Sequence, residues 1–236
     1  MAHSAGRTES RGRPLRRDRL AAAGAATGGG LIRPLGAAVM SLAVARTAGL
    51  DVLGAVVRVQ ILVQLVALVA QWGGRQALVR AMATEPGGRT AQWRAGVVAR
   101  LPVLVVPGAL LVAVLAPGSM KTVAVIWFAA LWFTEMVEAR VTVGRHFVAA
   151  GLVDVAVLGA ALVALASVPD RTIAVVWVYA GAASLRSGML WWTTQAAKPR
   201  PVACRTGIDR LRVDSPLAGA ALAGYGQSRG AVVLAA

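Results

Sequence analysis

The feature that most constrains this chain is a run of about nineteen mostly apolar residues, Val52–Gln71, which follows a turn containing Arg46 and Asp51. As an α-helix, a run of that length rises roughly 28 Å, close to the thickness of the hydrocarbon core of a bilayer. The sequence Trp-Gly-Gly-Arg, at residues 72–75, ends the run. Because a buried helix of a soluble protein seldom needs that length, the run predicts a membrane-spanning helix.

The composition favours the same class of protein. Of the 236 residues, 57% are hydrophobic and only 15% are charged, and the mean hydropathy is +0.65. These values are far from those of an ordinary soluble domain. The net charge of +15 would suit a nucleic-acid partner, but the basic residues lie between apolar runs and do not form one polar face. We therefore expect membrane lipids as partners and no nucleic acid.

The residues that usually carry catalysis are scarce. Cys204 is the only cysteine, and His3 and His146 are the only histidines, so the sequence offers no Cys/His metal site. It also shows no nucleophile elbow, no phosphate-binding glycine loop and no close pair of carboxylates. The sequence therefore predicts that the chain is not an enzyme and holds no metal or cofactor.

The order of apolar and polar segments predicts an all-α bundle of six membrane spans. Residues 1–20 read as a basic, disordered cytoplasmic tail, 21–192 as the bundle, 193–215 as a polar cytoplasmic linker, and 216–236 as a partial seventh apolar segment. The six spans are expected at residues 21–45, 52–71, 95–115, 122–137, 147–168 and 172–192. We expect the first span to kink or to start late, because Gly28–Gly30 and Pro34 interrupt it.

The basic residues of the connections predict the orientation. Lys and Arg number six, one, four, one, two, one and five in successive connections along the chain. Cytoplasmic connections carry the excess of Lys and Arg. This alternation places the N-terminus in the cytoplasm and predicts a multi-pass protein of the cytoplasmic membrane.

Six charged residues fall inside the predicted spans. A charge near the bilayer centre costs about 2.5–3.5 kcal/mol on insertion scales. Three of the six lie near cytoplasmic ends, where long side chains can reach the interface (Arg100, Glu135 and Arg186). The other three lie deeper and should face the bundle interior, a partner charge or a water-filled cavity (Arg33, Arg58 and Asp154).

Two glutamines add polar character to the second span. Gln60 and Gln64 are four residues apart and therefore share one face of the helix. The face could line a polar cavity or form hydrogen bonds to neighbouring helices, and the sequence does not separate these two roles. The candidate substrate-binding residues are thus Arg33, Arg58, Gln60, Gln64 and Asp154.

Residues 41–80 contain a recognisable order of residues, mostly small or basic: Ala45-Arg46, Gly49-Leu50, Gly54, Gly73-Gly74 and Arg80. In this order the stretch resembles the first two helices of the polysaccharide-biosynthesis flippases of the multidrug/oligosaccharidyl-lipid/polysaccharide exporter superfamily. The resemblance implies a carrier that moves lipid-linked oligosaccharide or polysaccharide precursors, as in lipopolysaccharide or exopolysaccharide export, across the cytoplasmic membrane by alternating access. It also implies two six-helix halves around a cationic cavity, in which Arg33 and Arg58 would meet an anionic, lipid-linked glycan.

The chain has about half the length of such a flippase. We expect either a truncated or decayed chain that is inactive alone, or a half that works as a homodimer. Two other functions stay open: a multidrug-type exporter of small molecules, and a non-transporting membrane scaffold in which the buried charges pair with each other.

Overall fold

The structure is a computed structural model that describes residues 32–84, 88–115, 118–168 and 171–195. The predicted tail at 1–20 and the C-terminal segment at 216–236 lie outside the described residues, and so does the predicted linker except for residues 193–195. The expected interruption at Gly28–Gly30 lies outside them as well.

All regular elements of the described residues are helices. The first helix covers residues 32–47 and is followed by α2 (Leu50–Gln71), α3 (Gly74–Thr84) and α4 (Arg89–Arg100). A 3₁₀ turn, η2 (Leu101–Leu104), leads into α5 (Val105–Val114), and then come α6 (Ser119–Gly144), α7 (Phe147–Ser167) and α8 (Thr172–Thr193).

Five of the described segments are long and apolar enough to cross a membrane: α2, Arg89–Val114, α6, α7 and α8. The predicted helical membrane bundle is therefore confirmed in class, with five candidate spans in the described part of the chain. The helix at 32–47 is the described part of the predicted first span. The chain is thus a multi-pass membrane protein.

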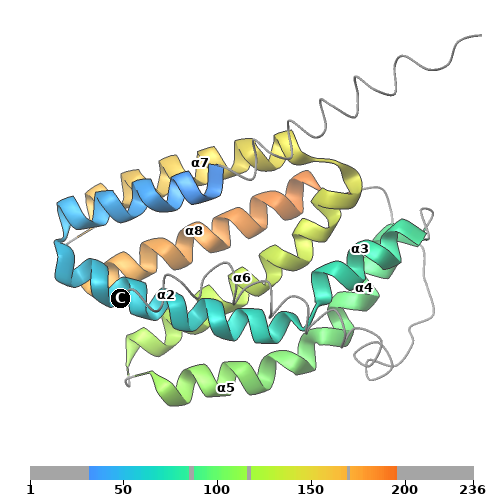
Figure 1. Ribbon diagram of the computed structural model, residues 1–236, viewed down its shortest axis with the longest axis horizontal. Helices are drawn as coiled ribbons and strands as arrows, with labels where there is room; N and C mark the ends of the chain where they lie inside the picture. Colours follow the sequence, from blue (N-terminus) through green and yellow to red (C-terminus); the bar gives the residue numbers. More distant parts are fainter. Residues whose placement is uncertain (1–31, 85–87, 116–117, 169–170, 196–236) are drawn as a thin grey trace, which may run out of the picture.

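Helix α6 lies at the centre of the bundle and is the most buried of the five spans (Figure 1). It packs against α8, α2 and α3, while α8 also packs against α7. The helix at 32–47 runs beside α7, where a Cβ atom on Gly36 would lie 3.6 Å from Leu158. The bundle thus encloses α6 between helices from both ends of the described sequence.

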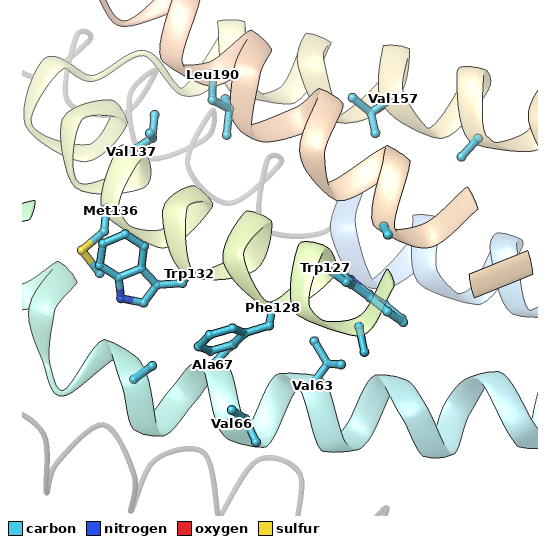
Figure 2. Packing of buried hydrophobic residues seen from close by; sticks show 14 of the residues in the cluster. Val63, Val66, Ala67, Trp127, Phe128, Trp132, Met136, Val137, Val157 and Leu190 are labelled. Atoms are coloured by element: carbon cyan, nitrogen blue, oxygen red, sulfur yellow. The ribbon is translucent and has the colours of Figure 1, made fainter. Parts of the chain in front are cut away.

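Large side chains on the buried face of α6 fill the core. Phe128 points from α6 toward α2, where Val63 and Val66 lie, and Trp127 and Trp132 extend from the same helix (Figure 2). These five side chains are each at most 5% exposed. Burying a side chain of this kind stabilises a packed core by roughly 1.5–3 kcal/mol in water. In a membrane the same contacts act mainly through close packing, because lipid is also apolar.

Two of the predicted boundaries are wrong. The predicted connector at 72–94 is mostly helical, since α3 and α4 pack against each other as a hairpin. Only Trp72 and Gly73, with φ of 43° and 68°, separate α3 from α2. The predicted fourth span at 122–137 was placed too short, because α6 continues to Gly144. The sequence predicts a connection at Glu138 and Arg140, whereas both residues are helical and buried in α6.

Candidate functional site

A cavity of about 690 Å³ opens between the helix at 32–47, α2, α6, α7 and α8. Its wall is mostly apolar and includes Trp127 and Tyr179, whose ring centroids are 5.5 Å apart. Charged side chains are confined to the part of the wall formed by Arg33, Glu135, Glu138, Asp154 and Arg186. The cavity therefore combines an apolar wall with one strongly charged region.

Six residues form the charged cluster at this cavity: Arg33, Arg75, Glu135, Glu138, Asp154 and Arg186. They come from five helices, because Arg33 lies at 32–47, Arg75 on α3, the two glutamates on α6, Asp154 on α7 and Arg186 on α8. The cluster holds three guanidinium groups and three carboxylates, so its formal charge is zero.

Glu138 is the centre of the charged cluster. Its Oε1 atom accepts from Arg33 Nη2 at 2.5 Å and from Arg186 Nη1 at 3.0 Å, and its Oε2 atom lies 3.1 Å from Arg75 Nη1. The side chain of Glu138 is only 4% exposed. A carboxylate this far from water is stable only with such partners, since an unpaired charge would be strongly unfavourable there.

Asp154 provides the second carboxylate of the cluster. Its Oδ1 atom accepts from Arg186 Nε at 2.6 Å, and its Oδ2 atom lies 3.4 Å from Arg33 Nε. Arg33 and Arg186 thus each connect Asp154 to Glu138. A closed ring of four charges results, and it ties the helix at 32–47, α6, α7 and α8 together.

The structure brings four of the five sequence-predicted residues to the cavity. Arg33 and Asp154 meet there as an ion pair, as expected of deep charges, and Gln60 and Gln64 line the wall contributed by α2. Arg58 does not line the cavity. It is exposed on α2 and its Nε donates to the carbonyl of Gly54 at 3.4 Å. Substrate binding by these residues stays a prediction.

Sequence reasoning missed the two residues that complete the cluster, Glu138 and Arg75. Both lie in predicted connections, because the predicted fourth span ends at Val137 and the predicted connector begins after Gln71. The available signal was the spacing of Glu135 and Glu138, three residues apart and so on one face of any helix that continues through them.

The expectation that Arg100, Glu135 and Arg186 reach the membrane interface is wrong for two of them. Arg186 is 15% exposed and belongs to the charged cluster. Arg100 is only 2% exposed, and its Nη1 donates to the carbonyl of Gly96 at 2.9 Å. Glu135 is 28% exposed and pairs with Arg75 at 3.4 Å. The burial of these side chains depends on tertiary contacts, which the position of a residue within a predicted span does not reveal.

Arg140 forms a separate buried site on α6. Its guanidinium lies over the rings of Trp93 and Trp191, 5.3 and 4.9 Å from their centroids, and one Nη donates to the carbonyl of Thr194. Trp93 in turn donates from Nε1 to the carbonyl of Met136 at 2.7 Å. A cation over two aromatic faces and at the C-terminal end of α8 is stabilised without a carboxylate. We interpret this site as a structural clamp.

The charged wall of the cavity is suited to the recognition of an anionic group. The guanidinium groups of Arg33 and Arg186, which line the cavity, can exchange a carboxylate for a phosphate, since both offer oxygens that match the planar donors of arginine. Among residues 32–195 that the structure describes, no group of His, Cys, Asp and Glu side chains is arranged to hold a metal ion.

No protein-family model, curated protein or solved structure matches this chain.

Proposed function

We propose that the chain is a membrane carrier for anionic amphiphiles, most specifically for lipid-linked oligosaccharide or polysaccharide precursors. One observation carries the proposal: a charged cluster with two arginines in the wall lies at a cavity whose remaining wall is mostly apolar, among helices long enough to span a membrane. Ionisable residues inside a membrane bundle commonly mark a substrate pathway. The proposal includes six spans, a cytoplasmic N-terminus and a place in the cytoplasmic membrane.

The two parts of the cavity suit the two parts of such a substrate. A diphosphate or acidic sugar would exchange with a carboxylate at Arg33, whose side chain is 44% exposed and hence the most accessible of the cavity-lining arginines. Gln60 and Gln64 could form hydrogen bonds to sugar hydroxyls, since an amide both donates and accepts. The apolar wall would contact the lipid part of the substrate.

A transport assay with the purified chain tests the proposal. Proteoliposomes would carry a fluorescent polyprenyl-diphosphate sugar, and dithionite would quench the label in the outer leaflet only. We expect faster loss of protected fluorescence with the chain than in empty liposomes. Arg33→Gln should lower the rate at least tenfold, and Arg58→Gln, an exposed arginine outside the cavity, should leave it within about twofold. Equal rates for Arg33→Gln and the parent chain would contradict the proposal.

A non-transporting scaffold is the second candidate, and the neutral balance of the charged cluster favours it. In that case all six charges serve to hold helices together, and no substrate displaces them. The same liposomes separate the two functions, because a scaffold would give the rate of empty liposomes with every variant. A cationic dye in place of the glycolipid tests the third possibility, a multidrug-type exporter.

A further inference from the structure

Two breaks in helix geometry flank the α3–α4 hairpin, whose second helix, α4, is also the first part of the candidate span Arg89–Val114. On one side, Trp72 and Gly73 take left-handed backbone angles between α2 and α3. On the other side, the 3₁₀ turn η2, which contains Pro102, lies between α4 and α5. Breaks of this kind are common hinges, because a few residues there can absorb changes in φ and ψ. Figure 1 shows α3 and α4 side by side, beyond the end of α2.

The two breaks meet at one contact. A Cβ atom on Gly74, the first residue of α3, would lie 2.7 Å from Nε and 2.9 Å from Cδ of Arg100, the last residue of α4. It would also lie 3.1 Å from Cε of Met136 on α6. A side chain at residue 74 would require Arg100 to move, because the two ends of the hairpin are packed against each other and against α6. The contact at its base makes the hairpin one packed unit.

Arg75 connects this unit to the charged cluster. It lies in the first turn of α3, and its Nη1 atom is 3.1 Å from Glu138 Oε2 and 3.4 Å from Glu135 Oε2. Both partners are on α6. The two ion pairs join the first turn of α3 to the central helix. On α4, Trp93 adds a second attachment, because it donates to the carbonyl of Met136 and packs against Phe133 and Trp191.

The two oxygens of Glu138 serve different elements. Oε1 faces Arg33 and Arg186 at the cavity, whereas Oε2 faces Arg75 on the hairpin. We propose that the α3–α4 hairpin is a hinged element whose α3 end is held against α6 by the Arg75–Glu138 ion pair and is coupled through Glu138 to the occupancy of the cavity. This coupling rests on the proposed function, because it requires an anionic ligand at Arg33 and Arg186.

The direction of the coupling follows from charge. An anion that draws Arg33 and Arg186 away from Glu138 removes two of the three cations that compensate this carboxylate. The remaining pair with Arg75 then becomes stronger, since the local dielectric is low and less positive charge competes for the carboxylate. Ligand binding should therefore hold the hairpin closer to α6 and narrow its range of positions.

Distances between spin labels in the full-length chain test the hinge. Cys204 is replaced by Ser, and labels are placed on cysteines at Ala83 on the hairpin and Val148 on α7, both exposed. A matched pair at Val69 and Val148 reports on the bundle without the hairpin. We expect Arg75→Gln to shift or broaden the Ala83–Val148 distribution and to leave the Val69–Val148 distribution unchanged. An unchanged distribution for both pairs would overturn the hinge.

Farnesyl diphosphate is the ligand probe, and tryptophan fluorescence reports its binding independently of the labels. Binding that narrows the Ala83–Val148 distribution in the parent chain, but not in Arg75→Gln, supports the coupling. Binding without any change in the distribution overturns it while the proposed function stands. If farnesyl diphosphate does not bind, the proposed function and the coupling are both overturned. The effect of Arg75→Gln on the distance distribution without ligand then tests the hinge by itself.

Discussion

The Nε atom of Arg186 donates to Oδ1 of Asp154 at 2.6 Å, and this ion pair joins α8 to α7 inside the bundle. The two side chains are 15% and 7% exposed. Asp154 is the only charged residue of α7, so this residue makes the only ion pairs that α7 forms in the described part of the chain. The position of α7 therefore depends on Asp154 keeping its partners.

A double-mutant cycle should measure the coupling energy between Asp154 and Arg186. Asp154→Asn and Arg186→Gln should each destabilise the chain, and the double variant should lose less than the sum of the two. We expect a coupling energy of about 1–3 kcal/mol, as for residues in one ion-pair network. Unfolding in mixed micelles gives the free energies. The combination of Asp154→Asn with Arg58→Gln is the control and should be additive, because Arg58 bonds to the carbonyl of Gly54 whereas Asp154 pairs with Arg33 and Arg186.

Glu138 and Glu135 should differ in their contribution to stability. Glu138→Gln leaves Arg33, Arg75 and Arg186 without their common partner, and removing one member of a buried network costs about 3–5 kcal/mol. Glu135→Gln removes one long pair from a side chain that is 28% exposed, and its cost should be well below 1 kcal/mol. Equal melting temperatures for the two variants in detergent would contradict the central place of Glu138.

Gly74→Ala should destabilise the bundle, because the added Cβ would overlap the side chain of Arg100. Overpacking of this kind costs about 1–3 kcal/mol. Gly54→Ala on α2 is the matched control, since its Cβ would meet nothing within 4 Å. There we expect a small gain, because alanine favours a helix over glycine by up to about 1 kcal/mol. Thermal unfolding in detergent measures both, and a stabilised Gly74→Ala would disprove the contact.

Arg140→Gln should lower stability by about 2 kcal/mol or more, because the variant loses the two ring contacts and leaves the carbonyl of Thr194 without its donor. Arg140→Lys should recover part of the loss, since an ammonium keeps the charge but not the planar stacking. Arg145→Gln, at an exposed arginine on the same helix end, should have little effect. A red shift of tryptophan emission should accompany the loss at Arg140.

Reporter fusions should establish the orientation. Alkaline phosphatase is active outside the cytoplasmic membrane, so fusions after residues 49 and 118 should be active and fusions after 88 and 146 inactive. The reason is the excess of arginine in the connections that contain residues 88 and 146. Activity at 88 together with inactivity at 49 would reverse the orientation.

The apolar runs of the sequence predicted the long helices well, because a bilayer demands a minimum length and a low charge. The expectation that Arg33 and Asp154 avoid lipid rests on the same physics, and the structure places both at the cavity. The sequence reading failed where polar residues extend a helix. Glu138 and Arg140 lie on α6 because partners from other helices stabilise them, and a single-sequence pattern contains no record of those partners.

Arg58 shows the opposite error: the sequence predicts that it is buried, and the structure leaves it exposed. Its depth along α2 suggested a buried charge, but the direction of a side chain around the helix depends on which neighbours pack against it. The structure turns Gln60 and Gln64 toward the cavity and leaves Arg58 exposed. A uniformly apolar helix gives no amphipathic stripe from which this rotation could be read.

The long separation in sequence between the members of the charged cluster bears on how the chain enters the membrane. Arg33 and Asp154 are 121 positions apart, so the ribosome completes several helices before Arg33 can find its carboxylate partners. During synthesis the first helix must keep this arginine at the lipid headgroups, in water or against the insertion machinery. The bundle should therefore assemble late, when α6, α7 and α8 have all left the translocon, and a chain cut before α6 should be a target for membrane proteases.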